Sequence, residues 1–210
     1  MTSIQAIRTG FGLLFCTTVL IGIIPSSALS LPTDQSKSLP AGESNGMKSL
    51  SPEKVADFIH AIVEADRNIY TTHIVKRMQE QGVVQAREDW ENKNAIPLPA
   101  QFLHISSKLV AESGHGIRFR LISLWPIYRR NGPATDFERK ALEQLSLNSN
   151  TTQRGIVTTG KKRLFQAIYA DKAINDTCVS CHNAHPLSPK RDFRKGDLMG
   201  AIVVTIPLDD

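Results

Sequence analysis

Two cysteines and one histidine form the most informative group of residues in the chain. Cys178 and Cys181 are separated by two residues, and His182 follows the second cysteine directly. Two thiols at this spacing can form thioethers to both vinyl groups of a haem, and the next residue can bring its imidazole to the iron. The pattern therefore predicts one covalently attached haem c, with Cys178 and Cys181 as the attachment points and His182 as the proximal iron ligand.

Three other uses of the same residues compete with haem attachment. A thioredoxin-like redox pair stands after the first strand of a βαβ unit, whereas this pair lies late in the chain. A zinc site could use His182 and His185, but no second Cys-x-x-Cys completes the ligand set. A structural disulfide across so short a loop would be strained. We favour haem over all three.

A haem iron bound by His182 has a second axial position. Either a protein side chain fills this position, or it stays open to water or gas. His73 is the first candidate for this distal ligand, because it lies on the apolar stripe of a long predicted helix. The alternative is that His73 is an ordinary hydrogen-bonded core residue. Weaker distal candidates are His60, His104, His115, Met78 and Met199.

Basic and aromatic side chains supply candidates for the rest of a haem pocket. The propionate groups of a haem could pair with Arg118, Arg120, Lys190 and Arg191. The pocket walls could include Tyr70, Phe102, Phe119 and Trp125, although any one of these aromatic residues could equally belong to the plain core.

A long helix is predicted at the start of the folded domain. Ser51 followed by Pro52 is a typical helix start, and Gly82 stands where a C-terminal glycine cap is expected. The helix should therefore cover residues 52–81, with His60 on the side opposite its apolar stripe. The stripe is expected to comprise Val55, Phe58, Ile59, Ile62 and Ile69.

The remaining pattern changes from helices to strands along the chain. Helical periodicity is expected over 84–91, 99–112 and, after a capping box at Thr135, up to Leu147. Strands are expected over 117–125, 155–159, 163–170 and 199–206, the last nearly all apolar and central. The cysteine motif falls in an apparently irregular segment, 175–197. This order of elements predicts an α+β domain.

The N-terminal residues resemble an export signal. Arg8 precedes an uncharged apolar run over 11–24, and small residues follow at 28–30, so residues 1–30 are expected to be a signal peptide. Residues 31–50 are expected to be a flexible linker and 51–210 the haem domain. The location would be a periplasm or lumen, with an uncleaved membrane anchor as the alternative. The net charge of +5 is scattered in short clusters, so nucleic-acid binding is not expected.

The combined motifs resemble a family of bacterial c-type monohaem proteins with a PAS-like sensor fold, first catalogued as a domain of unknown function. The matching residues are Ala65-Asp66, Tyr70-Thr71-Thr72-His73, 96–103, Leu124-Trp125-Pro126-Ile127, Asn131-Gly132-Pro133, 178–190, Gly196-Asp197 and Gly200. The resemblance implies a single haem held by a PAS-like antiparallel sheet with flanking helices. Distal ligation varies among similar proteins, with cysteine as one option, and residues 31–210 hold no third cysteine.

The resemblance implies a sensor of redox state or small ligands. No output domain is expected after residue 210, and the signal is therefore expected to pass to a separate redox or signalling partner. The alternative is a soluble electron-transfer cytochrome. Peroxidase activity is not expected, because no distal acid–base pair is recognisable, and the chain is therefore predicted not to be an enzyme.

Overall fold

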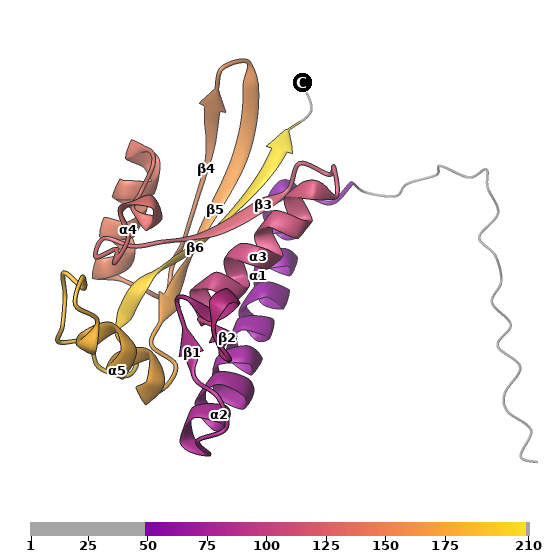
Figure 1. Cartoon of the computed structure of the whole chain (residues 1–210). Helices are drawn as coiled ribbons and strands as arrows, with labels where there is room; N and C mark the ends of the chain where they lie inside the picture. The colour runs from indigo at the N-terminus through magenta and orange to yellow at the C-terminus, as the bar shows by residue number, and fades with distance from the viewer. Residues whose placement is uncertain (1–48, 209–210) are drawn as a thin grey trace, which may run out of the picture. The chain divides into compact units, whose positions relative to one another are not determined.

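A four-stranded antiparallel sheet forms the centre of the computed structural model, which describes residues 49–208 (Figure 1). Its strands are β3 (Arg118–Ile122), β4 (Thr152–Thr159), β5 (Lys162–Lys172) and β6 (Leu198–Leu208), in the order β3-β6-β5-β4. Residues 199–204 of β6 are all buried, because this strand has a neighbour on each edge and packing on both faces. The predicted central position of the last strand is confirmed.

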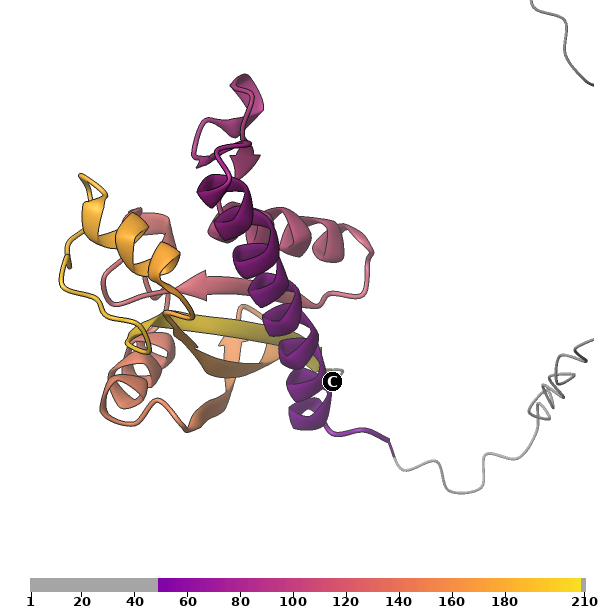
Figure 2. The same cartoon turned by 90° about the horizontal axis from the view of Figure 1, so that it is seen from below.

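Helices cover both faces of the sheet. On one face, α1 (Pro52–Ile69) and α3 (Pro99–Glu112) contribute Ala56 and Leu103 to a core with Phe165 and Ile202. On the other face, the apolar side of α4 (Asp136–Leu147) packs against the sheet. Figure 2 shows α3 and α4 on opposite sides of the sheet. The predicted α+β class, with an antiparallel sheet, a long N-terminal helix and flanking helices, is confirmed.

The long N-terminal helical run contains a change of helix type. After α1 the chain continues as a π-helical segment, η1 (Tyr70–Lys76), and then as α2 (Arg77–Glu80). Ser51 accepts a hydrogen bond from the Lys54 N–H, and Gly82 has a φ of 65°, so both predicted ends are confirmed. Short π-helical insertions often occur at functional sites.

The apolar stripe predicted for this helix is only partly buried: Ile59 packs against the core, but three other members do not. Phe58, Ile62 and Ile69 are exposed, with 48%, 64% and 55% of their surface accessible. The helix is rotated so that Ala56 and Arg67 are buried, because the small alanine lets the backbone approach the sheet and the arginine finds a carboxylate there. The side opposite the predicted stripe therefore packs as well, since His60 stacks on Tyr169.

Two other predicted segments differ from the structure. Residues 84–91 form no helix; β1 (Ala86–Arg87) pairs in parallel with β2 (Ile96–Pro97), and a 3₁₀ turn, η2 (Trp90–Asn92), lies between them. The segment 175–197 is not irregular throughout, because α5 (Asp176–Ala184) forms within it. A second 3₁₀ turn, η3, covers Arg129–Asn131.

The other predicted elements are present. The helices expected at 99–112 and from Thr135 to Leu147 are confirmed, and the expected strands match β3 to β6 with small shifts of their ends. The predicted signal peptide and nearly all of the predicted linker lie outside the described residues. Between residues 49 and 208, no helix combines the length and the apolarity needed to cross a membrane.

Candidate functional site

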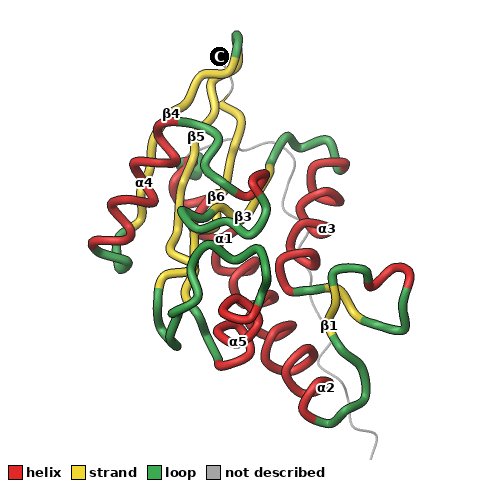
Figure 3. The backbone as a smooth tube through the Cα atoms, turned by 60° about the vertical axis from the view of Figure 1, so that its left-hand side comes forward, coloured by secondary structure: helices red, strands yellow, loops and turns green. Residues whose placement is uncertain are grey.

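The cysteine motif lies on a short capped helix, α5 (Figure 3). Asn175 precedes the helix, and its side-chain Oδ1 accepts a hydrogen bond from the Cys178 N–H at 3.2 Å. At about 100° per residue, Cys178, Cys181 and His182 share one face of the helix. Both cysteines are free thiols, so the helix presents two thiols and an imidazole together.

The His182 ring is held by a buried aromatic residue. Its centroid lies 5.9 Å from that of Phe193, with the rings nearly perpendicular. The Asn183 side chain donates to the Phe193 carbonyl at 2.9 Å and accepts from its N–H at 3.0 Å. Trp125 meets Phe193 edge-on, also at 5.9 Å. These contacts fix the position of the Phe193 ring, against which the His182 imidazole packs.

The surroundings of His182 favour its neutral form. Burial lowers the pKa of His182, and the neighbouring Arg67 and His185 lower it further. A neutral imidazole has a free nitrogen lone pair, which is the form that binds metals. The helix thus presents an imidazole in the protonation state that metal binding requires.

A small core lies beneath α5, separate from the two cores of the sheet. Ala173, Phe193 and Met199 are buried there, and Cys178 and Trp125 pack against them. One thiol of the motif is consequently anchored in an apolar environment, while Cys181 is exposed. The motif therefore has one half-buried thiol and one exposed thiol.

Two polar contacts connect this region to the long N-terminal helical run. Asn175 Nδ2 donates to the hydroxyl of Thr72, in η1, at 3.4 Å. Arg67 and Asp171 form a buried ion pair with contacts of 2.7 and 3.0 Å. Burial raises the pKa of Asp171, and Arg67 acts in the opposite direction. Asp171, in the strand before α5, therefore contacts α1, and Asn175, the N-cap of α5, contacts η1.

The C-terminal end of α5 has its own contact. His185 Nε2 lies 3.0 Å from a carboxylate oxygen of Glu88, in the segment after β1. The same carboxylate accepts a hydrogen bond from the Tyr128 hydroxyl at 2.5 Å. Both ends of the helix are thus joined to segments distant in sequence.

Some of the predicted distal and propionate residues lie beside α5 or in the long N-terminal helical run, and the others lie on the sheet. Lys190 Nζ lies over the Trp125 and Phe193 rings, at 5.6 and 5.0 Å from their centroids. Arg191 donates to the Pro186 carbonyl, so both basic residues flank α5. His73 is exposed in η1, one residue after Thr72.

The other two predicted propionate partners lie on the sheet. Arg118 pairs in register with Thr205, at the end of β6 remote from Met199. Arg120 forms an ion pair with the buried Glu138 of α4, on the face opposite α1. Neither residue is brought together with the cysteine motif.

Most of the weaker candidates have other neighbours. His60 stacks on Tyr169 with a centroid distance of 3.8 Å, and Tyr70 stacks on Phe102 at 4.4 Å. Phe119 belongs to the core between the sheet and α1. His104 and His115 are exposed. Of the predicted aromatic and methionine candidates, Trp125 and Met199 join the cluster around the motif.

Several residues of this site were not singled out from the sequence. Asn175 could have been found, because asparagine before Asp176 is a typical helix N-cap pattern. Thr72, Arg67 and Asp171 carried no such signal, because their contacts join residues more than a hundred positions apart. Phe193 resembled any other apolar residue.

No group of three or more His, Cys, Asp or Glu side chains arranged to hold a metal ion is found between residues 49 and 208.

Comparisons with known proteins place the chain in a family. The model of the family described as "Tll0287-like: Tll0287" matches residues 49–207. A solved structure, the crystal structure of the cyanobacterial heme-protein Tll0287, is similar at 20% identity, covering 77% of this chain and 99% of that chain with a TM-score of 0.49. No curated protein matches. The family match confirms the resemblance inferred from the sequence, and the chain belongs to the Tll0287-like family.

Proposed function

We propose that this chain is an exported haem c protein in which Cys178 and Cys181 form the two thioethers and His182 binds the iron. The observation that carries the proposal is the shared face of α5, where two free thiols accompany a neutral imidazole. Membership of a family whose solved relative is a heme-protein supports it. Export to a periplasm or lumen fits covalent attachment, which needs reduced thiols on an exported chain.

The residues of the site fit this group chemically. Cysteine thiols and a histidine nitrogen at this spacing are the donors that haem c uses. Phe193 and Asn183 hold the imidazole in place, and the apolar cluster around Cys178 excludes water from one side of the site. A haem attached there would supply a redox-active iron with one further axial position.

We propose sensing as the role of the bound haem, with the signal passing to a separate protein partner. The contacts from Asn175 to Thr72 and from Asp171 to Arg67 support this role, because a shift of α5 would pull on the long N-terminal helical run. The chain would act by binding and not by catalysis. Electron transfer is the second candidate, favoured by the exposure of Cys181, which leaves one edge of the attachment site at the surface.

The attachment proposal is tested by expressing the full chain together with haem-attachment machinery. We expect a mass increase of one haem and colour that resists acid–acetone extraction. The double variant Cys178→Ala/Cys181→Ala should lose both. Ser180→Ala, on the same helix and exposed, should keep them. A wild-type chain with free thiols and the mass of the bare polypeptide would refute the proposal.

The two roles are separated by the reduction potential and by ligand binding. A sensor should show slow electron exchange, or displacement of its distal ligand by CO or NO. Fast electron exchange with a potential in the range of respiratory or photosynthetic carriers, and no ligand binding, would instead establish the carrier.

A further inference from the structure

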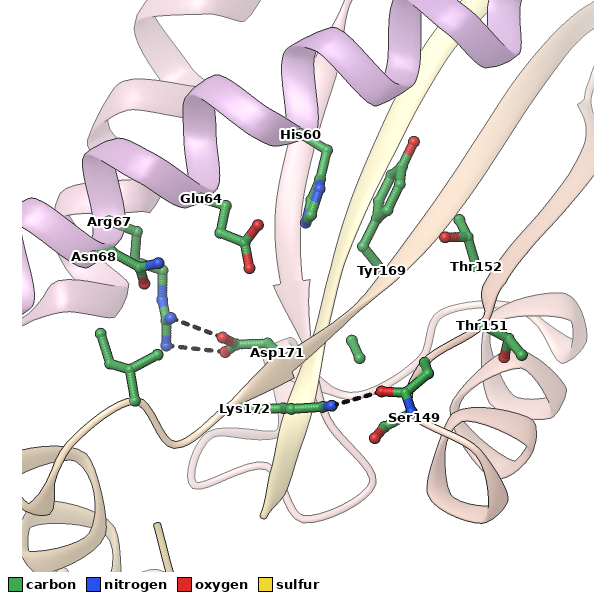
Figure 4. Close-up of a pocket in the computed structure, with 13 residues that line it drawn as sticks. His60, Glu64, Arg67, Asn68, Ser149, Thr151, Thr152, Tyr169, Asp171 and Lys172 are labelled. Carbon is green, nitrogen blue, oxygen red and sulfur yellow. Dashed lines mark hydrogen bonds and ion pairs between the residues drawn. The ribbon is translucent and has the colours of Figure 1, made fainter. Parts of the chain in front are cut away.

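A polar pocket of about 340 Å³ lies between α1 and the C-terminal end of β5 (Figure 4). Its lining comes from three parts of the chain: the end of β5 with Ile174, residues 149–152 at the start of β4, and one side of α1. The α1 residues are His60, Glu64, Arg67 and Asn68. The proposed attachment of haem uses none of these side chains.

The pocket collects buried polar atoms that have no hydrogen-bond partner. Between residues 49 and 208, four buried side-chain atoms lack one, and three of them belong to residues of this lining: His60 Nε2, Arg67 Nε and Asn68 Oδ1. A buried donor or acceptor without a partner destabilises the fold, so such atoms are rare unless something binds to them. Their concentration in one pocket indicates a polar occupant.

The donors around the pocket favour a carboxylate. Arg67 uses two of its nitrogens on Asp171, and its Nε–H remains available. Lys172 lies on the opposite wall and donates to Asn150 Oδ1 at 3.1 Å (Figure 4). Guanidinium and ammonium groups are the preferred partners of carboxylates. Glu64, the second carboxylate of the lining, is exposed, so solvent screens its charge.

The pocket adjoins the attachment site. Ile174 is part of its lining, and the next residue, Asn175, caps the helix that carries the cysteines. Arg67 also acts electrostatically on His182. A group held on α5 would therefore have this pocket beside it.

We propose that this pocket binds carboxylate groups through Arg67 Nε and the Lys172 ammonium, with Asn68 as a further partner. The nearest source is the propionate side chains of the haem, an assignment that rests on the proposed function. A free small carboxylic acid is the other source of the same chemistry. Asn68 donates a hydrogen bond to a carboxylate from either source if its amide is turned so that the nitrogen faces the pocket.

The decisive variant is Arg67→Lys, because it keeps a positive charge facing Asp171 and removes the Nε–H. Asn68→Ala is a second variant that leaves the ion pair intact. Arg120→Lys is the matched control, since Arg120 pairs with Glu138 on the other face of the sheet. All are prepared as the full chain carrying its haem, and thermal unfolding verifies that each is folded.

The first measurement is the propionate bending band in the resonance Raman spectrum, together with the pH dependence of the reduction potential. We expect Arg67→Lys and Asn68→Ala to shift both, with Arg120→Lys unchanged. The second measurement is calorimetric titration with succinate and acetate. Binding to the wild type that weakens about tenfold or more in Arg67→Lys would identify a free carboxylate as the occupant.

The inference is overturned if the Raman band and the potential do not respond to either variant and neither acid binds to the wild type. Its failure is distinct from failure of haem attachment, which the mass of the purified chain reports. If the chain carries no haem, the titration alone decides: binding that depends on Arg67 supports the pocket, and absence of binding overturns it.

Discussion

Asn175 forms hydrogen bonds with Thr72 and with the backbone of α5 at the same time. Its Nδ2 donates to Thr72 Oγ1 at 3.4 Å, while its Oδ1 accepts from the Cys178 N–H at 3.2 Å. One side chain therefore caps α5 and links it to the π-helical turn of the long N-terminal run. The cap depends on an acceptor and the link on a donor, so the two roles can be separated by substitution.

Replacing Asn175 should distinguish the cap from the link. Asn175→Ala removes both, and we expect a loss of about 1 kcal/mol in the free energy of unfolding, which lowers the melting temperature by about 2–4 °C. Asn175→Asp keeps an N-cap acceptor but cannot donate to Thr72, so it should recover most of the loss. Thermal unfolding followed by circular dichroism measures both. Equal stability of the alanine variant and the wild type would contradict the capping role.

His73 is the candidate distal ligand, and its substitution has a spectroscopic signature. Loss of a sixth ligand changes a ferric haem from low spin to high spin. We therefore expect His73→Ala to shift the Soret band and the spin state of the ferric protein. His104→Ala, which removes an exposed histidine of α3, is the control. An unchanged spectrum in His73→Ala would exclude this residue from the axial position.

Phe193 should contribute more to the free energy of unfolding than an exposed phenylalanine does. Phe193→Leu removes the edge-to-face contacts with Trp125 and His182, so we expect a loss of about 1–2 kcal/mol in stability. The same change at Phe58, which is 48% exposed, should stay within about 0.5 kcal/mol of the wild type. Chemical denaturation compares the two variants, and equal losses would show that the contacts to His182 contribute nothing.

Asp57 should make stability depend on pH in the acid range. A hydrogen bond from the Tyr169 hydroxyl, and then one from Arg154, lower the pKa of Asp57 below its usual value of 3.8. Because the folded-state pKa is the lower one, the contribution of Asp57 is fully present above pH 3.8 and is lost as the pH falls through the folded-state value.

The variant Asp57→Asn tests this pH dependence. At pH 7, Asp57→Asn should lower the free energy of unfolding by about 0.5 kcal/mol, because the Asp57 side chain is 39% exposed and solvent screens its charge. The difference from the wild type should shrink as the pH is lowered from about 5 to about 2. Asp66→Asn, an exposed position on the same helix, should show little difference at any pH. A difference between Asp57→Asn and the wild type that is constant with pH would contradict the assignment.

Features encoded by residues close together in the chain could be predicted without the structure. The spacing of Cys178, Cys181 and His182, the Ser51 cap and the apolar run of β6 each depend on a few adjacent positions. The capping pattern at Asn175 was equally local, and α5 was missed because its composition resembled a loop. The same motifs carried the family resemblance, which the match over 49–207 confirmed.

Tertiary structure alone decided which side of α1 is buried and what stands beside the motif. Periodicity indicated an apolar stripe on α1, but Phe58 and Ile62 of this stripe are exposed, whereas Ile59 packs against the core. The orientation of the helix follows from Ala56 against the sheet and from Arg67 reaching Asp171, 104 positions away. Pairings over such separations arise only when whole elements pack, because no local preference of either residue encodes the partner.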